Sequence, residues 1–191
     1  MSHTHTSACA ARALIAACLL TGCYHGTART IAAADVRREP GWVLVDKMHL
    51  VPQTDLRDCG AAALAMMLGH WSLPISKDEI LRSVPMDPAH GIAAGALRDL
   101  AVRKGMNAFL FVGELADLFN EIGLDRPVLV GLVQRYGDRA ISHYEVVAGV
   151  NRATRRVLLM DPGHGLREDT FEGFAEEWTA AGRPTLVIIP S

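Results

Sequence analysis

The segment from Cys59 to His70, CGAAALAMMLGH, restricts the fold of this chain more than any other stretch. From Cys59 to Leu68 this segment contains only small or apolar residues, so none of its sides can face water favourably. Such a run favours a helix that is buried on all sides. Further helices are expected nearby, over 76–84 with a Ser76–Glu79 capping box, over 92–104 and over 113–123.

Strand character dominates the second half of the chain. Short apolar runs, which are typical of buried strands, occur at 106–112, 126–133, 143–150, 156–161 and 185–190. The stretch 42–53 is also β-rich, and 170–182 has the pattern of an amphipathic helix with Phe171, Phe174 and Trp178 on its buried side. Helices followed by strands predict an α+β fold, with an N-terminal helical part packed against a C-terminal antiparallel sheet. A site would lie in the groove between the two parts.

The N-terminus is typical of an exported chain. Arg12 precedes a short apolar core, Ala13–Leu20, which is too short to span a bilayer. The next residues, LTGC, resemble the lipobox of bacterial lipoproteins, which implies that Cys23 is lipidated and becomes the new N-terminus. A plain signal peptide or a poor transmembrane anchor is the alternative.

These features divide the chain into three parts. Residues 1–22 are the expected signal peptide of the lipoprotein type, 23–41 the lipidated N-terminus with a tether, and 42–191 a single folded domain. The expected location is the cell envelope, with the chain anchored to a membrane by its lipid. Because Tyr24 and not Asp follows Cys23, similarity to enterobacterial lipoproteins favours the periplasmic face of the outer membrane.

Charge and motifs exclude several classes of function. The chain has 19 Lys+Arg and 21 Asp+Glu, and removal of Arg12 leaves 18 − 21 = −3, which is not the basic balance of a nucleic-acid-binding protein. The sequence contains no CxxC pair, no HExxH motif and no GxxxxGK[ST] loop, so zinc sites and P-loop nucleotide sites lack support. We therefore expect no metal, no other cofactor and no nucleic-acid partner.

Processing of the N-terminus would leave Cys59 as the only free thiol, because the other cysteines lie at or before Cys23. A lone cysteine cannot form an internal disulfide, so it is either an inert core residue or a reactive thiol. Asp58 is a good N-cap residue, and the dipole at the first helical turn favours a thiolate. We expect Asp58 to cap this helix and Gly60 to leave room for a substrate backbone.

A histidine and an acid are expected to lie close together in the sheet. If 143–150 pairs with 156–161 across the turn NRATR, the numbers of opposite residues sum to roughly 304–306, so Asp161 lies opposite His143 or nearly so. An imidazole oriented by a carboxylate is the base that a thiol nucleophile requires. Gln53 precedes Cys59 by six residues, and its amide could assist the Cys59 N–H in stabilising an oxyanion.

Together these residues resemble the bacteriocin-processing, or double-glycine, cysteine peptidases, a family with a papain-like fold. The resemblance rests on Gln53 and Cys59 in QTDLRDCG, on HYEVV and on DPG, and it covers roughly residues 48–190. It implies a papain-like peptidase domain with Cys59 as nucleophile and His143 as general base and acid. Asp161 would orient His143, and Gln53 would be the oxyanion donor.

The resemblance also implies a function, namely a membrane-tethered cysteine endopeptidase that cleaves an exported peptide or protein. The substrate could carry a leader sequence and a Gly-Gly type cleavage site, and secretion or surface-assembly components would be the partners. Two alternatives remain open. One is a peptide-binding or scaffold lipoprotein that has the same fold without catalysis, and the other is a cell-wall amidase of another papain-like lineage.

Overall fold

The computed structural model describes residues 23–191, and the predicted signal peptide over 1–22 lies outside the described residues. The helices of the described part are α1 (Ala33–Arg38), α2 (Cys59–His70), α3 (Lys77–Ser83), α4 (Ala94–Arg103), α5 (Leu115–Gly123) and α6 (Phe171–Ala180). Its strands are β1 (Arg29–Thr30), β2 (Trp42–Leu44), β3 (Met106–Val112), β4 (Val128–Tyr136), β5 (Arg139–Asn151), β6 (Arg156–Asp161), β7 (Gly165–Thr170) and β8 (Pro184–Pro190). Within this part of the chain, no helix combines the length and the apolar character that crossing a bilayer requires.

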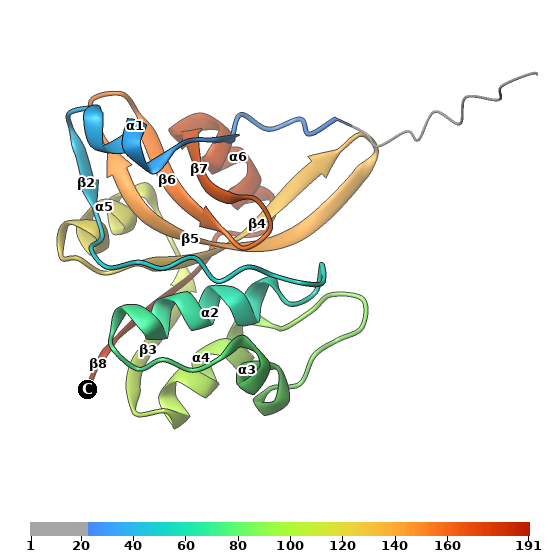
Figure 1. Ribbon diagram of the computed structural model, residues 1–191. Helices are drawn as coiled ribbons and strands as arrows, with labels where there is room; N and C mark the ends of the chain where they lie inside the picture. Colours follow the sequence, from blue (N-terminus) through green and yellow to red (C-terminus); the bar gives the residue numbers. More distant parts are fainter. Residues whose placement is uncertain (1–22) are drawn as a thin grey trace, which may run out of the picture.

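The strands form one eight-stranded antiparallel sheet in the order β1-β7-β6-β5-β4-β8-β3, with β2 paired to the end of β5. Helices α2, α3 and α4 lie together on one side of the sheet (Figure 1). The predicted α+β class, with the helical part packed against an antiparallel sheet, is confirmed. The long central strand β5 contacts α2, and Tyr144, Val146 and Ala148 of this strand belong to the apolar cluster that contains α2.

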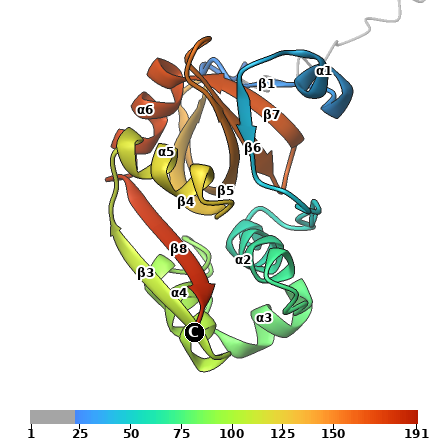
Figure 2. The same cartoon turned by 90° about the vertical axis from the view of Figure 1, so that its left-hand side faces the viewer.

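Apolar side chains cover both faces of the sheet. On β4, Val128 and Val130 belong to a cluster with residues of α5 and α6, whereas Leu129 belongs to a second cluster with residues of α2 and α4. This alternation follows from the geometry of a strand, whose successive side chains point to opposite faces. Figure 2 shows the same division, with α5 and α6 on the side away from α2.

Helix α2 is buried from Cys59 to Leu68, as its composition predicts. Because every side of the helix contacts protein, the chain needs no polar stripe there. Cys59, the first residue of this buried helix, therefore lies where the helix meets β5.

Two local predictions near α2 are only partly right. Ser76 accepts a hydrogen bond from the Glu79 N–H at 3.1 Å, but the Glu79 carboxylate accepts from Lys104 at 2.8 Å, so only half of the capping box forms. The β-rich stretch 42–53 contributes only the short strand β2. Lys47 has a φ of 54°, which extended strands do not adopt, and the chain therefore leaves the sheet.

Residues 23–41, for which we expect a tether, contact the sheet at several points. Tyr24 forms a β-bridge with Tyr136, strand β1 pairs with β7, and Val36 of α1 is only 3% exposed. The small and polar side chains of this stretch give no periodic signal in the sequence. In the structure, the stretch pairs with strands that come much later in the chain. The fold therefore begins well before residue 42.

Strand β7 was not predicted, because its residues are mostly charged. Arg167, Glu168 and Asp169 follow one another and are only 4%, 2% and 2% exposed. Buried charges are tolerated when they are paired and hydrogen-bonded. The partners of these residues are Asp161 and Glu145 for Arg167, Arg29 and Arg156 for Glu168, and Thr27 for Asp169.

We predict that two phenylalanines differ sharply in their contribution to stability. Phe174 is fully buried between α6 and the sheet, so Phe174→Ala should lower the free energy of unfolding by about 3–5 kcal/mol. Phe109 on the edge strand β3 is 52% exposed, and Phe109→Ala is the matched control with a much smaller cost. Urea denaturation measures both, and equal losses would contradict the packing described.

Candidate active site

Cys59 and His143 line the same cleft, which has a volume of about 1170 Å³. Each of the two residues is only 6% exposed, so both are largely buried in the wall of the cleft. The cleft lies between the helical part and the sheet, as expected. Its walls come from the start of α2 with the loop before it, the loop that leads into α4, strands β4 and β5, and the segment from the end of α6 to β8.

His143 and Asp161 form the hydrogen bond that the sequence suggested, with Nε2 2.7 Å from Oδ1. The pairing of β5 with β6 matches Val146 with Met160, and continuation of this register places Asp161 opposite Glu145. His143 and Asp161 are therefore diagonal neighbours across the two strands, a separation that an imidazole can bridge. Asp161 is fully buried, so the ring of His143 is held by a carboxylate that water does not screen.

Both pKa values are displaced in the direction of an ion pair. Burial alone would lower the pKa of His143, but hydrogen bonds to Asp161 and Cys59, together with the nearby carboxylates, outweigh it and raise the pKa from 6.5 to about 10. Burial would raise the pKa of Asp161, but the hydrogen bond and charge of His143 and the Gly163 N–H hold it well below its usual range. The pair therefore favours imidazolium and carboxylate at neutral pH.

The side chain of Cys59 lies close enough to the His143 ring to contribute to the raised pKa of that ring. Because Asp161 holds Nε2, Nδ1 is the ring nitrogen that can face the sulfur. Cys59 is the first residue of α2, and no side chain caps this helix end. The thiol therefore stands at a helix end whose first backbone N–H groups have no side-chain partner.

Asp58 stands at the N-cap position, but its carboxylate does not cap the helix as predicted. It accepts hydrogen bonds from the Thr54 N–H at 3.1 Å, the Thr54 hydroxyl at 2.9 Å and Lys77 Nζ at 2.8 Å. With φ −99° and ψ 5°, its backbone lacks the extended conformation that turns an N-cap side chain toward the helix. Lys77 thus neutralises a negative charge beside Cys59 and fixes the loop before α2.

Gly60 has a different role from the one expected. An added Cβ would lie 3.1 Å from Tyr144 and 3.3 Å from Leu97, so the space beside this glycine is already filled by protein. Gly60 therefore allows α2 to approach β5 closely, and it does not leave room for a substrate. Close approach of the helix is what brings Cys59 to His143.

Gln53 lies beside the turn that follows Asp161. Its backbone N–H donates to the carbonyl of Pro162 at 2.9 Å, and its Nε2 and Asp161 Oδ1 are each 3.3 Å from the point where a Cβ of Gly163 would lie. The amide is thus close to the His143–Asp161 pair. Its Oε1 is buried and finds no hydrogen-bond partner in residues 23–191.

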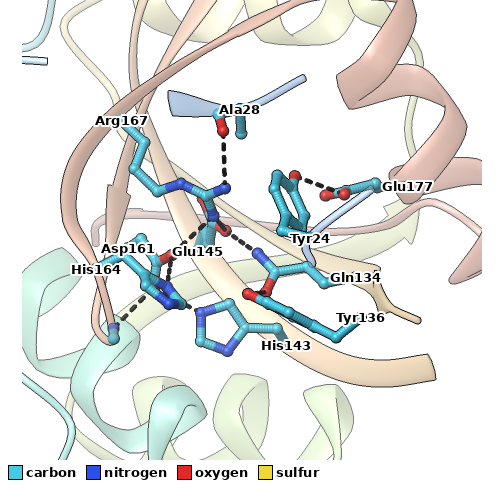
Figure 3. A network of polar contacts seen from close by, with 11 residues as sticks. Tyr24, Ala28, Gln134, Tyr136, His143, Glu145, Asp161, His164, Arg167 and Glu177 are labelled. Atoms are coloured by element: carbon cyan, nitrogen blue, oxygen red, sulfur yellow. Dashed lines mark hydrogen bonds and ion pairs between the residues drawn. The ribbon is translucent and has the colours of Figure 1, made fainter. Parts of the chain in front are cut away.

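A network of polar residues behind Asp161 was missed by the sequence analysis (Figure 3). Asp161 Oδ2 accepts from His164 Nδ1 at 2.8 Å and from Arg167 Nη1 at 2.9 Å, and the same Nη1 donates to Glu145 at 3.2 Å. Glu145 is two residues after His143 in the same strand, so strand periodicity could have placed it on the same face. Arg167 gave no such signal, since β7 was not expected.

The same region contains the one group of described residues whose spacing would suit a metal ion, namely His143, Glu145 and Asp161, with ligand atoms within 4.8 Å of one another. Most of the donor atoms in this group already have other partners, although Glu145 Oε2 has none among the described residues. Asp161 accepts from His143 and Arg167, and the guanidinium of Arg167 places a positive charge against both carboxylates. A cation would be repelled there, so the arrangement suits orientation of an imidazole better than metal binding.

Curated relatives match most of this chain. The transport/processing ATP-binding protein ComA of Streptococcus pneumoniae is 30% identical over 145 residues, which are 76% of this chain and 19% of that protein. The mesentericin-Y105 transport/processing ATP-binding protein MesD of Leuconostoc mesenteroides is 31% identical over 139 residues, which are 70% and 18%. The match thus spans about a fifth of the length of each relative.

Solved structures share the fold. The peptidase domain of Streptococcus ComA has a TM-score of 0.63 at 26% identity, covering 74% of this chain and 98% of that one. A putative C39-like peptidase from Bacillus anthracis has a TM-score of 0.65 at 16% identity, covering 78% and 98%, and at that identity it shows the fold alone.

The family assignment follows from the extent of the match. The model of the Peptidase C39 family matches residues 47–185, which include Gln53, Cys59, His143 and Asp161. Together with the papain-like architecture and the relatives above, this shows that the chain belongs to the Peptidase C39 family of cysteine peptidases.

Proposed function

We propose that this chain hydrolyses peptide bonds in an exported peptide or protein through the thiolate of Cys59. The observation that carries the proposal is the buried His143–Asp161 pair in a cleft that Cys59 also lines. An imidazole held by a buried acid near a thiol at a helix N-terminus is the arrangement that converts a weak nucleophile into a strong one.

In the proposed reaction, each residue has one task. The sulfur of Cys59 attacks the carbonyl carbon of the substrate and forms a C–S bond, while the carbonyl oxygen becomes an oxyanion. The Cys59 N–H and the Gln53 amide stabilise that oxyanion. His143 then protonates the departing amine as the C–N bond breaks, and later takes a proton from the water that hydrolyses the thioester. Asp161 keeps the ring in the required orientation throughout.

The names of the relatives support a proposal for the substrate class. ComA and MesD are transport/processing proteins, and a double glycine motif protease from an AMS/PCAT transporter has been solved in complex with the leader peptide. A peptide with a leader that ends in a Gly-Gly type site is therefore the substrate proposed for this chain. An extended substrate would lie along the cleft between α2 and the sheet.

Membrane attachment through Cys23 is part of the proposal. Cys23 is exposed, so its thiol is open to lipid modification. Its carbonyl accepts from the Gly137 N–H at 3.2 Å, at the hairpin between β4 and β5. A lipid on this residue would hold the folded domain close to the membrane at that hairpin. Secretion or surface-assembly components of the envelope are the partners proposed.

The first prediction concerns Cys59 itself. Iodoacetamide at neutral pH should modify Cys59, because its thiolate is stabilised by His143. Cys59→Ala should abolish cleavage of a Gly-Gly leader peptide, and His143→Ala should lower the rate by about 10²–10⁴-fold. Mass mapping of the modified cysteines and a peptide cleavage assay measure these effects.

The matched control is Cys23→Ser, which removes an exposed thiol that does not line the cleft and should leave the rate of the unlipidated protein unchanged. Full cleavage by Cys59→Ala would refute the proposed nucleophile. An inert Cys59 with no cleavage would favour a peptide-binding protein of the same fold.

The second prediction concerns Gln53. If its amide stabilises the oxyanion, Gln53→Ala should lower kcat by about 10²–10³-fold with little change in KM, since the interaction forms only in the transition state. Asn107→Ala, an amide on the exposed face of β3, is the control and should have normal kinetics. Normal kcat for Gln53→Ala would remove Gln53 from the mechanism.

The third prediction concerns the charge of His143. Its folded pKa of about 10 lies above the usual 6.5, so the ring should remain an imidazolium at pH 8. The stability it contributes should be full below pH 6.5 and should be lost progressively as pH rises from 6.5 to about 10. Asp161→Asn removes the carboxylate, so the pKa should fall and the ring should titrate at lower pH. NMR of the His143 ring protons measures both titrations, and a neutral ring at pH 8 in the unmodified protein would contradict the ion pair.

A further inference from the structure

Arg167 stands directly behind the acid that orients the proposed base. It is 4% exposed, and its Nη1 bridges Asp161 Oδ2 at 2.9 Å and Glu145 Oε1 at 3.2 Å. Gln134 Nε2 donates to the same Glu145 oxygen at 2.7 Å. A guanidinium forms planar, directional hydrogen bonds, so Arg167 fixes the rotation of the Asp161 carboxylate as well as compensating its charge.

The opposite side of Arg167 is held by residues near the N-terminus. Its Nη2 donates to the carbonyl of Ala28 at 3.3 Å, and its guanidinium carbon lies 5.0 Å from the centroid of the Tyr24 ring. The Tyr24 hydroxyl in turn donates to Glu177 of α6 at 2.6 Å. Figure 3 shows Tyr24 and Ala28 on one side of the guanidinium, and Asp161 and Glu145 on the other.

We call residues Tyr24–Thr30 the N-terminal segment, and its attachment to the sheet is extensive. Strand β1 pairs with β7, so that Thr30 lies opposite Arg167 itself, and Arg29 forms an ion pair with the buried Glu168. The segment lies outside residues 47–185, which match the family model. Its contact with Arg167 is therefore a feature of this chain that the family match does not cover.

We propose that Arg167 is a positioning residue for Asp161, and that the N-terminal segment holds Arg167 in place through Tyr24 and Ala28. The N-terminal segment is then part of the catalytic unit, although it does not reach the cleft residues Cys59 and His143. This inference rests on the proposed function, because it assigns Arg167 a role in activating the thiol.

The physical reason is the geometry of a carboxylate. Asp161 must keep Oδ1 directed at His143, and it accepts hydrogen bonds there from the ring and from the Gly163 N–H at 2.7 Å. The contacts on Oδ2 prevent rotation about the side-chain bond. His164, which supplies one of them, is half exposed, so the buried Arg167 provides the more rigid restraint.

The test measures how fast iodoacetamide alkylates Cys59 in the full chain at neutral pH, with each cysteine distinguished by peptide mass mapping. Arg167→Lys keeps the charge but cannot bridge Asp161, Glu145 and Ala28 together, and it should slow the reaction by about tenfold. Tyr24→Leu should slow it by about threefold. Arg155→Lys makes the same change at an exposed arginine that pairs with Glu172, and it is the matched control with a rate near that of the unmodified protein.

A role in stability alone is separated by measuring how much of each variant is folded. Opening of the fold can slow alkylation tenfold only if most molecules are open, and urea denaturation shows whether each variant is folded at neutral pH. Slower alkylation in Arg167→Lys and Tyr24→Leu that remain folded therefore reports on activation of the thiol. If Tyr24 acts through Arg167, Tyr24→Leu should have little further effect in the Arg167→Lys background.

The outcomes separate this inference from the proposed function. If Cys59 in the unmodified protein is no more reactive than a thiol in an unfolded peptide, the proposed function itself fails. If Cys59 is reactive but Arg167→Lys and Tyr24→Leu leave its rate unchanged or raise it, the positioning role is overturned while the proposed function stands. Slower rates that multiply independently in the double variant would overturn the coupling between Tyr24 and Arg167.

Discussion

The site depends on one buried carboxylate, that of Asp161. A carboxylate that is removed from water is stable only when donors and positive charges surround it, and Asp161 accepts from His143, Gly163, His164 and Arg167. Two of these donors belong to the turn that follows β6, which explains why the short sequence DPGHG can build half of the acid's environment. The remaining donors, His143 and Arg167, bind different oxygens of this carboxylate. The position of the His143 ring therefore depends on how the charge of Asp161 is paired.

The fold brings the thiol to that pair by close packing. Helix α2 has small residues along its length, and Gly60 lets its first turn approach Tyr144 of β5. Lys77 of α3 holds Asp58, so the negative charge next to Cys59 is neutralised away from the sulfur. The apolar clusters on opposite faces of the sheet hold β5 and β6 in place. The cleft lies between the start of α2 and strands β4 and β5.

Much of this was predictable from the sequence, for reasons that differ between residues. The apolar run of α2 and the strands around His143 carry strong periodic or compositional signals, and the short turn between β5 and β6 restricts the register enough to bring His143 near Asp161. The β-bulge near Ala148 and the diagonal arrangement of His143 and Asp161 could not be predicted from the pattern of apolar residues. Strand β7 and the pairing of residues 24–30 with the sheet were missed, because these residues interact with partners distant in sequence. The N-cap role of Asp58 was predicted from residue propensity alone. In the structure its carboxylate forms an ion pair with Lys77 instead.

The central claim is that Cys59 attacks a carbonyl within reach of His143 and of the oxyanion donors. A crystal structure of the protein treated with a peptide aldehyde ending in Gly-Gly tests this most directly. The account predicts a thiohemiacetal bonded to Cys59 Sγ, with its oxygen within hydrogen-bond distance of the Cys59 N–H and the Gln53 side chain, and with His143 Nδ1 next to the sulfur. A free thiol beside an unreacted aldehyde, or an adduct whose oxygen points away from both donors, would contradict it.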